Sequence, residues 1–261
     1  ARLEGVTVRP VAAPDHPVGR RGDNRFAHGD DVGIGDIVGP IDRLEAGDFI
    51  DAGDLDPKAV VLEQLKQQRE CRMRHAAIGG GKRVRPLLLV ATATMFNVSR
   101  EAAVLAGTAV EAIHVYSLIH DDLPCMDDDD MRRGKPTVHK AFDEATAVLA
   151  GDALHVLAFD ILTDASVSSD PFIQAELVRC LAKASGMSGM AGGQAMDMAA
   201  DSATYDLHTI TRLQQLKTGA LLTASVEMGA ILARVPHDAR GHLIAYARDI
   251  GLAFQIADDL L

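Results

Sequence analysis

The chain contains no tryptophan, and aromatic residues make up 4% of its 261 residues although hydrophobic residues make up 48%. Strands favour aromatic and β-branched residues, whereas helices favour alanine and leucine. A net charge of −11 argues against a general nucleic-acid binder, which needs a basic surface. Composition therefore favours a helical protein of one large domain or two small ones.

Cysteine is scarce as well. Cys71, Cys125 and Cys180 are the three cysteines, and their wide spacing fits neither a disulfide framework nor a zinc motif. We expect reduced thiols in the cytoplasm. No run approaches the roughly 18 uncharged apolar residues of a membrane span, so we expect none.

Residues 1–54 contain scattered Gly, Asp and Pro without a sustained period, and we interpret them as an N-terminal extension of uncertain order. Helical signals begin at Asp56–Pro57, a cap followed by a first-turn proline, and that helix is expected to continue past Met73 and end at Gly79–Gly81. We predict that residues 55–261 form a single domain.

The most informative stretch is residues 111–137, where an apolar helical pattern leads into clustered charges: Asp121, Asp122, Asp127–Asp130, Arg132 and Arg133. Crowded carboxylates repel one another unless they are solvated or share a cation. Mg²⁺ binds through a few carboxylates plus substrate phosphates, and arginines bind the same phosphates. The alternative is an acidic surface loop, or a calcium loop, for which the EF-hand spacing is missing.

A second charged segment follows three glycines. Lys82, Arg83 and Arg85 precede a helix expected from Leu87 to Phe96, so backbone amides, a helix N-terminus and cations converge there. This arrangement suits a phosphate, although a solvated basic turn is an equal alternative.

Ser99 is expected to cap a helix that continues to His120. On that helix His114, Ser117 and Asp121 share one face, with His114 about 10 Å along the axis from Asp121. A pocket wall with an imidazole at depth and a carboxylate at its mouth is one interpretation, and a core histidine is the other.

Four later helical patterns complete the chain. Residues 141–162 and 171–185 are apolar, separated by a loop at 164–170. Gln194 and Asp197 then lie on an apolar helix, where a buried Asp197 needs a cation, either a metal or Lys217, unless it makes a helix–helix hydrogen bond. Residues 250–261 again bring adjacent aspartates, Asp258 and Asp259, to the end of an apolar helix. Two acidic helices indicate a cavity with carboxylates on opposing walls.

These motifs together resemble the trans-isoprenyl diphosphate synthase family from about Asp56 to the last residue. The resemblance rests on GGKRVRP at 80–86, DDxxxxD at 121–127, RRG at 132–134, GQxxD at 193–197, KT at 217–218 and FQxxDD at 254–259. It implies an all-α bundle of long antiparallel helices around a central cavity, and a homodimer.

The resemblance also implies roles for individual residues. The residues implied to hold about three Mg²⁺ ions on an allylic diphosphate are Asp121, Asp127 and Asp258, assisted by Asp122, Arg132, Lys217, Thr218 and Gln255. Those implied to hold the diphosphate of isopentenyl diphosphate are Lys82, Arg85, His114 and Arg133. Gln194 and Asp197 are expected to be supporting residues. The implied activity is condensation of the two substrates.

Tyr116 and Ser117, about one helical turn before Asp121, are expected to set product length. Bulky Tyr116 resembles the bacterial farnesyl diphosphate synthases, whereas small Ser117 leaves geranylgeranyl diphosphate synthase as the alternative. A non-catalytic subunit of the same fold is another alternative. The chain stops one position short of the third aspartate of the second motif, so we expect that the family's C-terminal end is missing.

Overall fold

A computed structural model describes residues 73–77, 81–200 and 205–259, with side chains as far as Gln255. All of these residues belong to one compact unit. Its helices are α2 (Val84–Met95), α3 (Arg100–Asp121), α4 (Val138–Ala141), α5 (Glu144–Thr163), α6 (Pro171–Ser185), α7 (Met190–Ala200), α8 (Leu207–Gln214), α9 (Ala220–Leu232) and α10 (His237–Asp259), with a π-helical turn η3 (Gln215–Gly219) between α8 and α9. The all-α fold class is confirmed.

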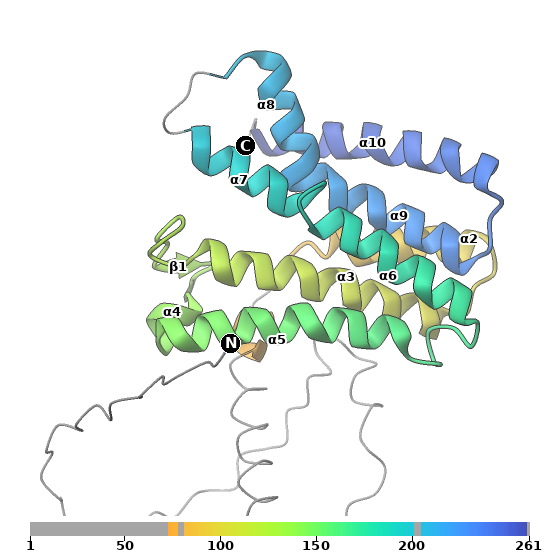
Figure 1. The fold of residues 1–261 in the computed structure, drawn as a ribbon, viewed down its shortest axis with the longest axis horizontal. Helices are drawn as coiled ribbons and strands as arrows, with labels where there is room; N and C mark the ends of the chain where they lie inside the picture. The colour runs from red at the N-terminus through yellow and green to blue at the C-terminus, as the bar shows by residue number, and fades with distance from the viewer. Residues whose placement is uncertain (1–72, 78–80, 201–204, 260–261) are drawn as a thin grey trace, which may run out of the picture. The chain divides into compact units, whose positions relative to one another are not determined.

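Helix α3 lies at the centre of the bundle, against α2, α5 and α9 (Figure 1). Its side chains at Val110, Ile113 and Ile119 are at most 1% exposed. Burying an aliphatic side chain of this size contributes about 1.5–3 kcal/mol. Since α3 is held on several sides, the residues at its C-terminal end project from a fixed support.

The caps explain where the helices begin. Ser99 accepts a hydrogen bond from the amide of Ala102, which confirms the predicted start of α3. Asp170 accepts from the amide of Phe172 ahead of α6, as the loop at 164–170 predicts. In each case a side-chain oxygen satisfies an amide that the first helical turn leaves unpaired.

Three predicted boundaries were wrong. The last helix, expected at 250–261, begins at His237 as α10. Helix α2 begins at Val84 rather than Leu87, so Arg85 and Pro86 are helical. The apolar pattern at 141–162 divides into α4 and α5, because Phe142 leaves the helical conformation and Asp143 starts a new helix by capping the amide of Thr146. Residues 73–77 are helical as expected, and the preceding part of that predicted helix lies outside the described residues.

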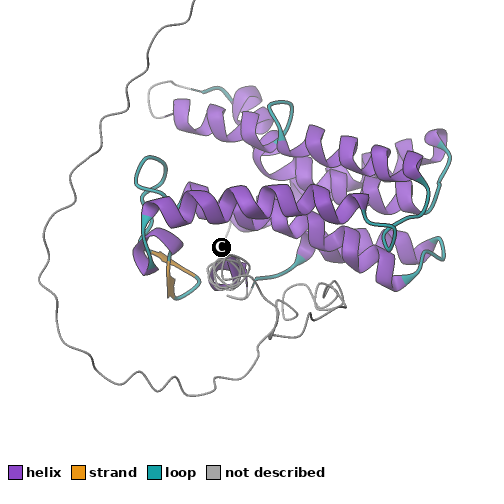
Figure 2. Cartoon of the chain, turned by 60° about the horizontal axis from the view of Figure 1, so that its bottom comes forward, coloured by secondary structure: helices purple, strands orange, loops and turns teal. Residues whose placement is uncertain are grey.

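A small antiparallel hairpin was not predicted. Strand β1 (Met131–Arg132) pairs with β2 (Lys135–Pro136), in the register Met131 to Pro136 and Arg132 to Lys135. Figure 2 shows it as a short ribbon beside the helices. Gly134, with φ of 76°, makes the turn, a conformation that favours glycine.

By length and composition, α3 and α5 are each able to cross a membrane. They pack along one another, and α3 also packs on α2 and α9 (Figure 1). Core helices of globular proteins reach the same hydropathy, so these two helices are weak evidence for a membrane span.

Candidate active site

The acidic residues gather where α3 ends. The backbone amide of Asp127 donates to the carbonyl of Asp121 over 2.9 Å, and the amide of Asp128 donates to the carbonyl of Leu123 over 3.1 Å. The loop therefore folds back on the end of α3, and the backbones of Asp121 and Asp127, the first and last aspartates of the DDxxxxD motif, are adjacent.

Crowding changes the protonation of this cluster. Burial, reinforced by repulsion from Asp127 and opposed by attraction to Lys217, raises the pKa of Asp121 to about 6. A carboxyl group with a raised pKa lacks compensating positive charge. Oxygen ligands short of a cation are the donors that Mg²⁺ prefers, so Asp121 and Asp127 fit that metal.

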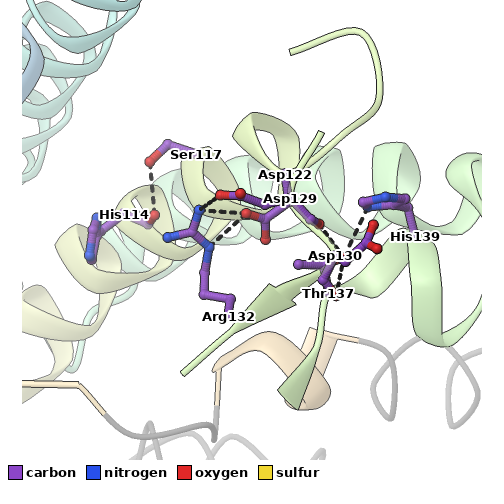
Figure 3. A network of polar contacts seen from close by, with 8 residues as sticks. All are labelled: His114, Ser117, Asp122, Asp129, Asp130, Arg132, Thr137 and His139. Carbon is purple, nitrogen blue, oxygen red and sulfur yellow. Dashed lines mark hydrogen bonds and ion pairs between the residues drawn. The ribbon is translucent and has the colours of Figure 1, made fainter. Parts of the chain in front are cut away.

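Arg132 is held by the carboxylates around it (Figure 3). Its Nε donates to the buried Asp122 over 2.6 Å, and its Nη2 lies 3.3 Å from Asp129. Burial raises the pKa of Asp122, and the guanidinium opposes that shift. Asp122 is thus already paired, unlike Asp121.

A third group of possible ligands adjoins the hairpin. Ligand atoms of Asp128, Asp130 and His139 lie within 4.8 Å of one another. Lys140 already pairs with Asp130 over 2.7 Å, and Nδ1 of His139 shares a hydrogen bond with Thr137 over 3.1 Å. Sequence reasoning missed His139, which lies between the acidic stretch and the helix predicted at 141–162.

The glycine-rich loop lies against the arginines that follow the acidic stretch. Gly81 has φ of 124°, and a Cβ there would come within 2.7 Å of the Arg133 guanidinium. The ammonium of Lys82 lies 5.6 Å from the ring centre of Phe254 on α10, which brings the last turns of that helix to the loop.

His114 lies among these cations and is neutral. Burial, and then the positive charges of Arg85 and Arg133, lower its pKa to about 2. Burial also lowers the pKa of Arg85, and its Nε is buried without a hydrogen-bond partner among the described residues. Such a donor needs an acceptor, and an anion would supply one.

Glu111 was missing from the sequence-based assignment of this cluster, and Arg83 was named there only as one of three cations in the loop. Arg83 donates to the buried carboxylate of Glu111 and, over 2.6 Å, to the carbonyl of Ala77. Glu111 lies three residues before His114 on an apolar helix. Its position was a usable signal, since a carboxylate on a buried face needs a cation.

Lys217 forms an ion pair with Asp197. The sequence had offered two cations for this carboxylate, a metal ion and Lys217. Lys217 lies in the π-helical turn η3, and such turns often occur at functional sites. A Cβ at Gly193 would overlap the backbone of Lys217, so glycine permits α7 to approach η3 closely. The buried amide of Gln194 has no hydrogen-bond partner among the described residues.

Tyr116 and Ser117 lie on α3, five and four residues before Asp121. The Tyr116 ring lies 4.8 Å from the imidazole of His155 on α5 and 5.7 Å from that of His120, centre to centre. Ser117 Oγ donates to the carbonyl of His114 over 2.9 Å (Figure 3).

Other predicted residues are not brought to this cluster by any described contact. Asp258 lies in α10 beyond the described side chains. Gln255 lines a different cavity of about 1020 Å³ between α6, α9 and α10, which the sequence did not predict and which none of the aspartates of residues 121–130 line. Thr218 is half-buried in η3.

Known proteins match the chain over most of these residues. A 191-residue match, covering 72% of this chain, is 50% identical to farnesyl diphosphate synthase of Escherichia coli and spans 64% of that relative's length. Geranylgeranyl pyrophosphate synthase 4 of Arabidopsis thaliana is 43% identical over 210 residues, 79% of this chain and 55% of the relative.

A solved structure agrees with these sequence matches. The crystal structure of an FPP/GFPP synthase from Zymomonas mobilis superposes with a TM-score of 0.72 at 59% identity, covering 86% of this chain and 78% of the other. The family model of polyprenyl synthetases matches residues 68–261. The chain therefore belongs to the polyprenyl synthetase family.

Proposed function

We propose that the protein is a short-chain prenyl diphosphate synthase that condenses isopentenyl diphosphate with dimethylallyl or geranyl diphosphate to give farnesyl diphosphate. The observation that carries this proposal is the meeting, along one face of α3, of a carboxylate cluster at Asp121 with a cluster of cations around His114. The similarity to E. coli farnesyl diphosphate synthase supports it.

The acidic cluster binds the allylic substrate. Asp121 and Asp127 would hold Mg²⁺, about three ions with Asp258, and the metal supplies positive charge that stabilises the departing diphosphate. Asp258 belongs to the last turns of α10, the helix on which the Phe254 ring lies 5.6 Å from the Lys82 ammonium.

The cationic cluster binds isopentenyl diphosphate. Lys82, Arg85 and Arg133 contact its diphosphate, and the unpartnered Nε of Arg85 finds its acceptor there. Neutral His114 donates one hydrogen bond without adding charge. Gln194 and Asp197 on α7 support the acidic half instead, since Asp197 pairs with Lys217.

The reaction needs no side-chain nucleophile. The allylic C–O bond breaks, and its electron pair leaves with the diphosphate, whose charge Lys217, Arg132, Thr218 and Gln255 stabilise. The double bond of isopentenyl diphosphate forms the new C–C bond to the allylic cation, and a proton is lost to the released pyrophosphate. Because the cation reacts with water, the site must close around it.

Tyr116 is the floor that ends chain growth. Its ring is packed by His120 and His155, about one turn below Asp121, where the tail of the product extends. The second candidate product is geranylgeranyl diphosphate, favoured by small Ser117 and by the similarity to the Arabidopsis enzyme.

We also propose a homodimer in the cytoplasm. Leu149 and Val156 on α5 are 58% and 67% exposed, seven residues apart and so on one face of the helix. A second copy would cover this apolar face. Exposed Cys125 and half-buried Cys180 are free thiols, which suits a reducing compartment.

The test is a direct assay of the purified protein. It is mixed with Mg²⁺, geranyl diphosphate and labelled isopentenyl diphosphate, and the products are separated by chain length. Farnesyl diphosphate supports the proposal, and longer products support the alternative. Absence of any condensation would indicate a non-catalytic subunit, and product formed without isopentenyl diphosphate would indicate a cyclase.

A further inference from the structure

Glu111 is a buried carboxylate whose charge belongs to the cationic cluster. Its residue is 4% exposed in the middle of α3, where an unpaired carboxylate would be costly. Its Oε1 accepts from Nη1 of Arg83, a residue 28 positions earlier in the chain. Glu111 therefore ties the glycine-rich loop to the central helix.

Arg83 is held in an unusual conformation at this contact. Its φ is 48°, in the left-handed region that non-glycine residues rarely adopt. Its second hydrogen bond, to the carbonyl of Ala77, joins the loop to the helical residues 73–77. A strained backbone persists when its surroundings hold it, and Glu111 provides the anchor here.

The influence of Glu111 extends beyond Arg83. Burial lowers the pKa of both Arg85 and Arg133, and the charge of Glu111 opposes this shift in each. Arg83 and Arg133 repel one another, as the lowered pKa of Arg133 indicates. One buried negative charge thus offsets part of the repulsion among the neighbouring guanidinium groups.

We infer that Glu111 is a positioning residue for the diphosphate of isopentenyl diphosphate: it fixes Arg83, and thereby the loop that carries Lys82 and Arg85, without touching the substrate. This inference rests on the proposed function. Simple electrostatics predicts the opposite effect, because a carboxylate inside the cluster repels an anion. The two views differ in the sign of the effect when Glu111 is neutralised.

The experiment compares Glu111→Gln with the wild-type full chain. We expect the KM for isopentenyl diphosphate to rise about tenfold, while kcat and the KM for geranyl diphosphate stay within about twofold. Glu111→Asp, which keeps the charge, is expected to recover most of the loss. The control is Glu101→Gln, in the first turn of the same helix, about 15 Å along the axis.

A double variant tests whether Glu111 acts through Arg83. If it does, Arg83→Gln/Glu111→Gln binds isopentenyl diphosphate no more weakly than the worse single variant. The inference would be overturned if the effects of the two substitutions on KM were strictly additive. It would also be overturned if Glu111→Gln melted like the wild type and its KM for isopentenyl diphosphate were unchanged or lower. If Glu111→Gln does not fold, Glu111→Asp serves as the test. Its KM for isopentenyl diphosphate is expected to rise about threefold, and an unchanged KM would show that the inference is wrong.

Binding without turnover separates this inference from the proposed function. Calorimetry with inorganic pyrophosphate, in the absence of Mg²⁺, measures anion binding without the metal that the acidic half needs. Weaker pyrophosphate binding in Glu111→Gln supports the positioning role even if no condensation is detected, a result that would contradict the proposed function alone. Equal or tighter binding in that variant contradicts the positioning role.

Discussion

The two halves of the proposed site differ in how far their crowded charges are balanced by groups of the opposite sign. In the cationic half, the buried Glu111 lies among the arginines as a counter-charge. In the acidic half, Arg132 pairs with Asp122 and Lys217 pairs with Asp197, and the pKa of Asp121 still rises to about 6. One half therefore has an unfilled need for a cation, and the other has a buried guanidinium donor that needs an anion.

The largest effect is expected from the half that lacks a cation. Asp121→Asn removes the carboxylate best placed to hold Mg²⁺, and we expect kcat/KM to fall about 1000-fold. Asp160→Asn, at an exposed position of α5, is the control. A loss of less than tenfold in the Asp121 variant would mean that this end of α3 does not bind the metal.

The cationic half should respond through substrate affinity. Arg133→Gln removes an exposed guanidinium beside Gly81, so we expect the KM for isopentenyl diphosphate to rise by about 10- to 100-fold, and kcat to change less. Arg100→Gln, at the exposed first residue of α3 and so at the opposite end of that helix from the acidic stretch, is the matched control. Equal effects on the two substrates would show that the halves are not separate.

A smaller effect is expected from substitution of Tyr116, which should change the chain length of the product rather than the rate of the reaction. Tyr116→Ala removes the ring that His155 and His120 pack against, and we expect a substantial share of products longer than farnesyl diphosphate. Tyr246→Ala, with a side chain exposed on α10, should leave the distribution unchanged. Chromatography of the products makes the comparison, and an unaltered profile for Tyr116→Ala would rule out the floor.

The smallest effect is expected in how the thermal stability of the metal-free protein changes with pH. Because the folded-state pKa of Asp121 is raised from 3.8 to about 6, its protonation favours the folded state. That contribution is complete below about pH 4 and is lost as the pH rises to about 6. Melting curves should show a fall in Tm across this window that is weaker in Asp121→Asn, and identical profiles would contradict the raised pKa.

Local signals made much of the fold predictable. Ser99 marked the start of α3 because capping depends on a few neighbouring residues. Lys217 was one of two cations considered for Asp197, and it pairs with that carboxylate although the side chain is 42% exposed rather than buried. The GGKRVRP and DDxxxxD motifs predicted the two halves of the proposed site.

What the sequence did not reveal depends on how helices rotate against one another. The pairing of Arg83 with Glu111 joins the glycine-rich loop to the middle of α3, and helical periodicity alone does not give that register. The π-helical turn at Lys217 and the stacking of His155 on Tyr116 likewise arise from packing between elements. The hairpin at 131–136 was hidden among charged residues with low strand propensity.

The most direct test of the two-part site is a crystal structure of the protein with Mg²⁺, isopentenyl diphosphate and an unreactive thio analogue of dimethylallyl diphosphate. We predict metal ions bound by Asp121 and Asp127 and shared across one cavity with Asp258, and the isopentenyl diphosphate on Arg85 and Arg133. Metal ions elsewhere, or Asp121 and Asp258 on unrelated surfaces, would contradict the account.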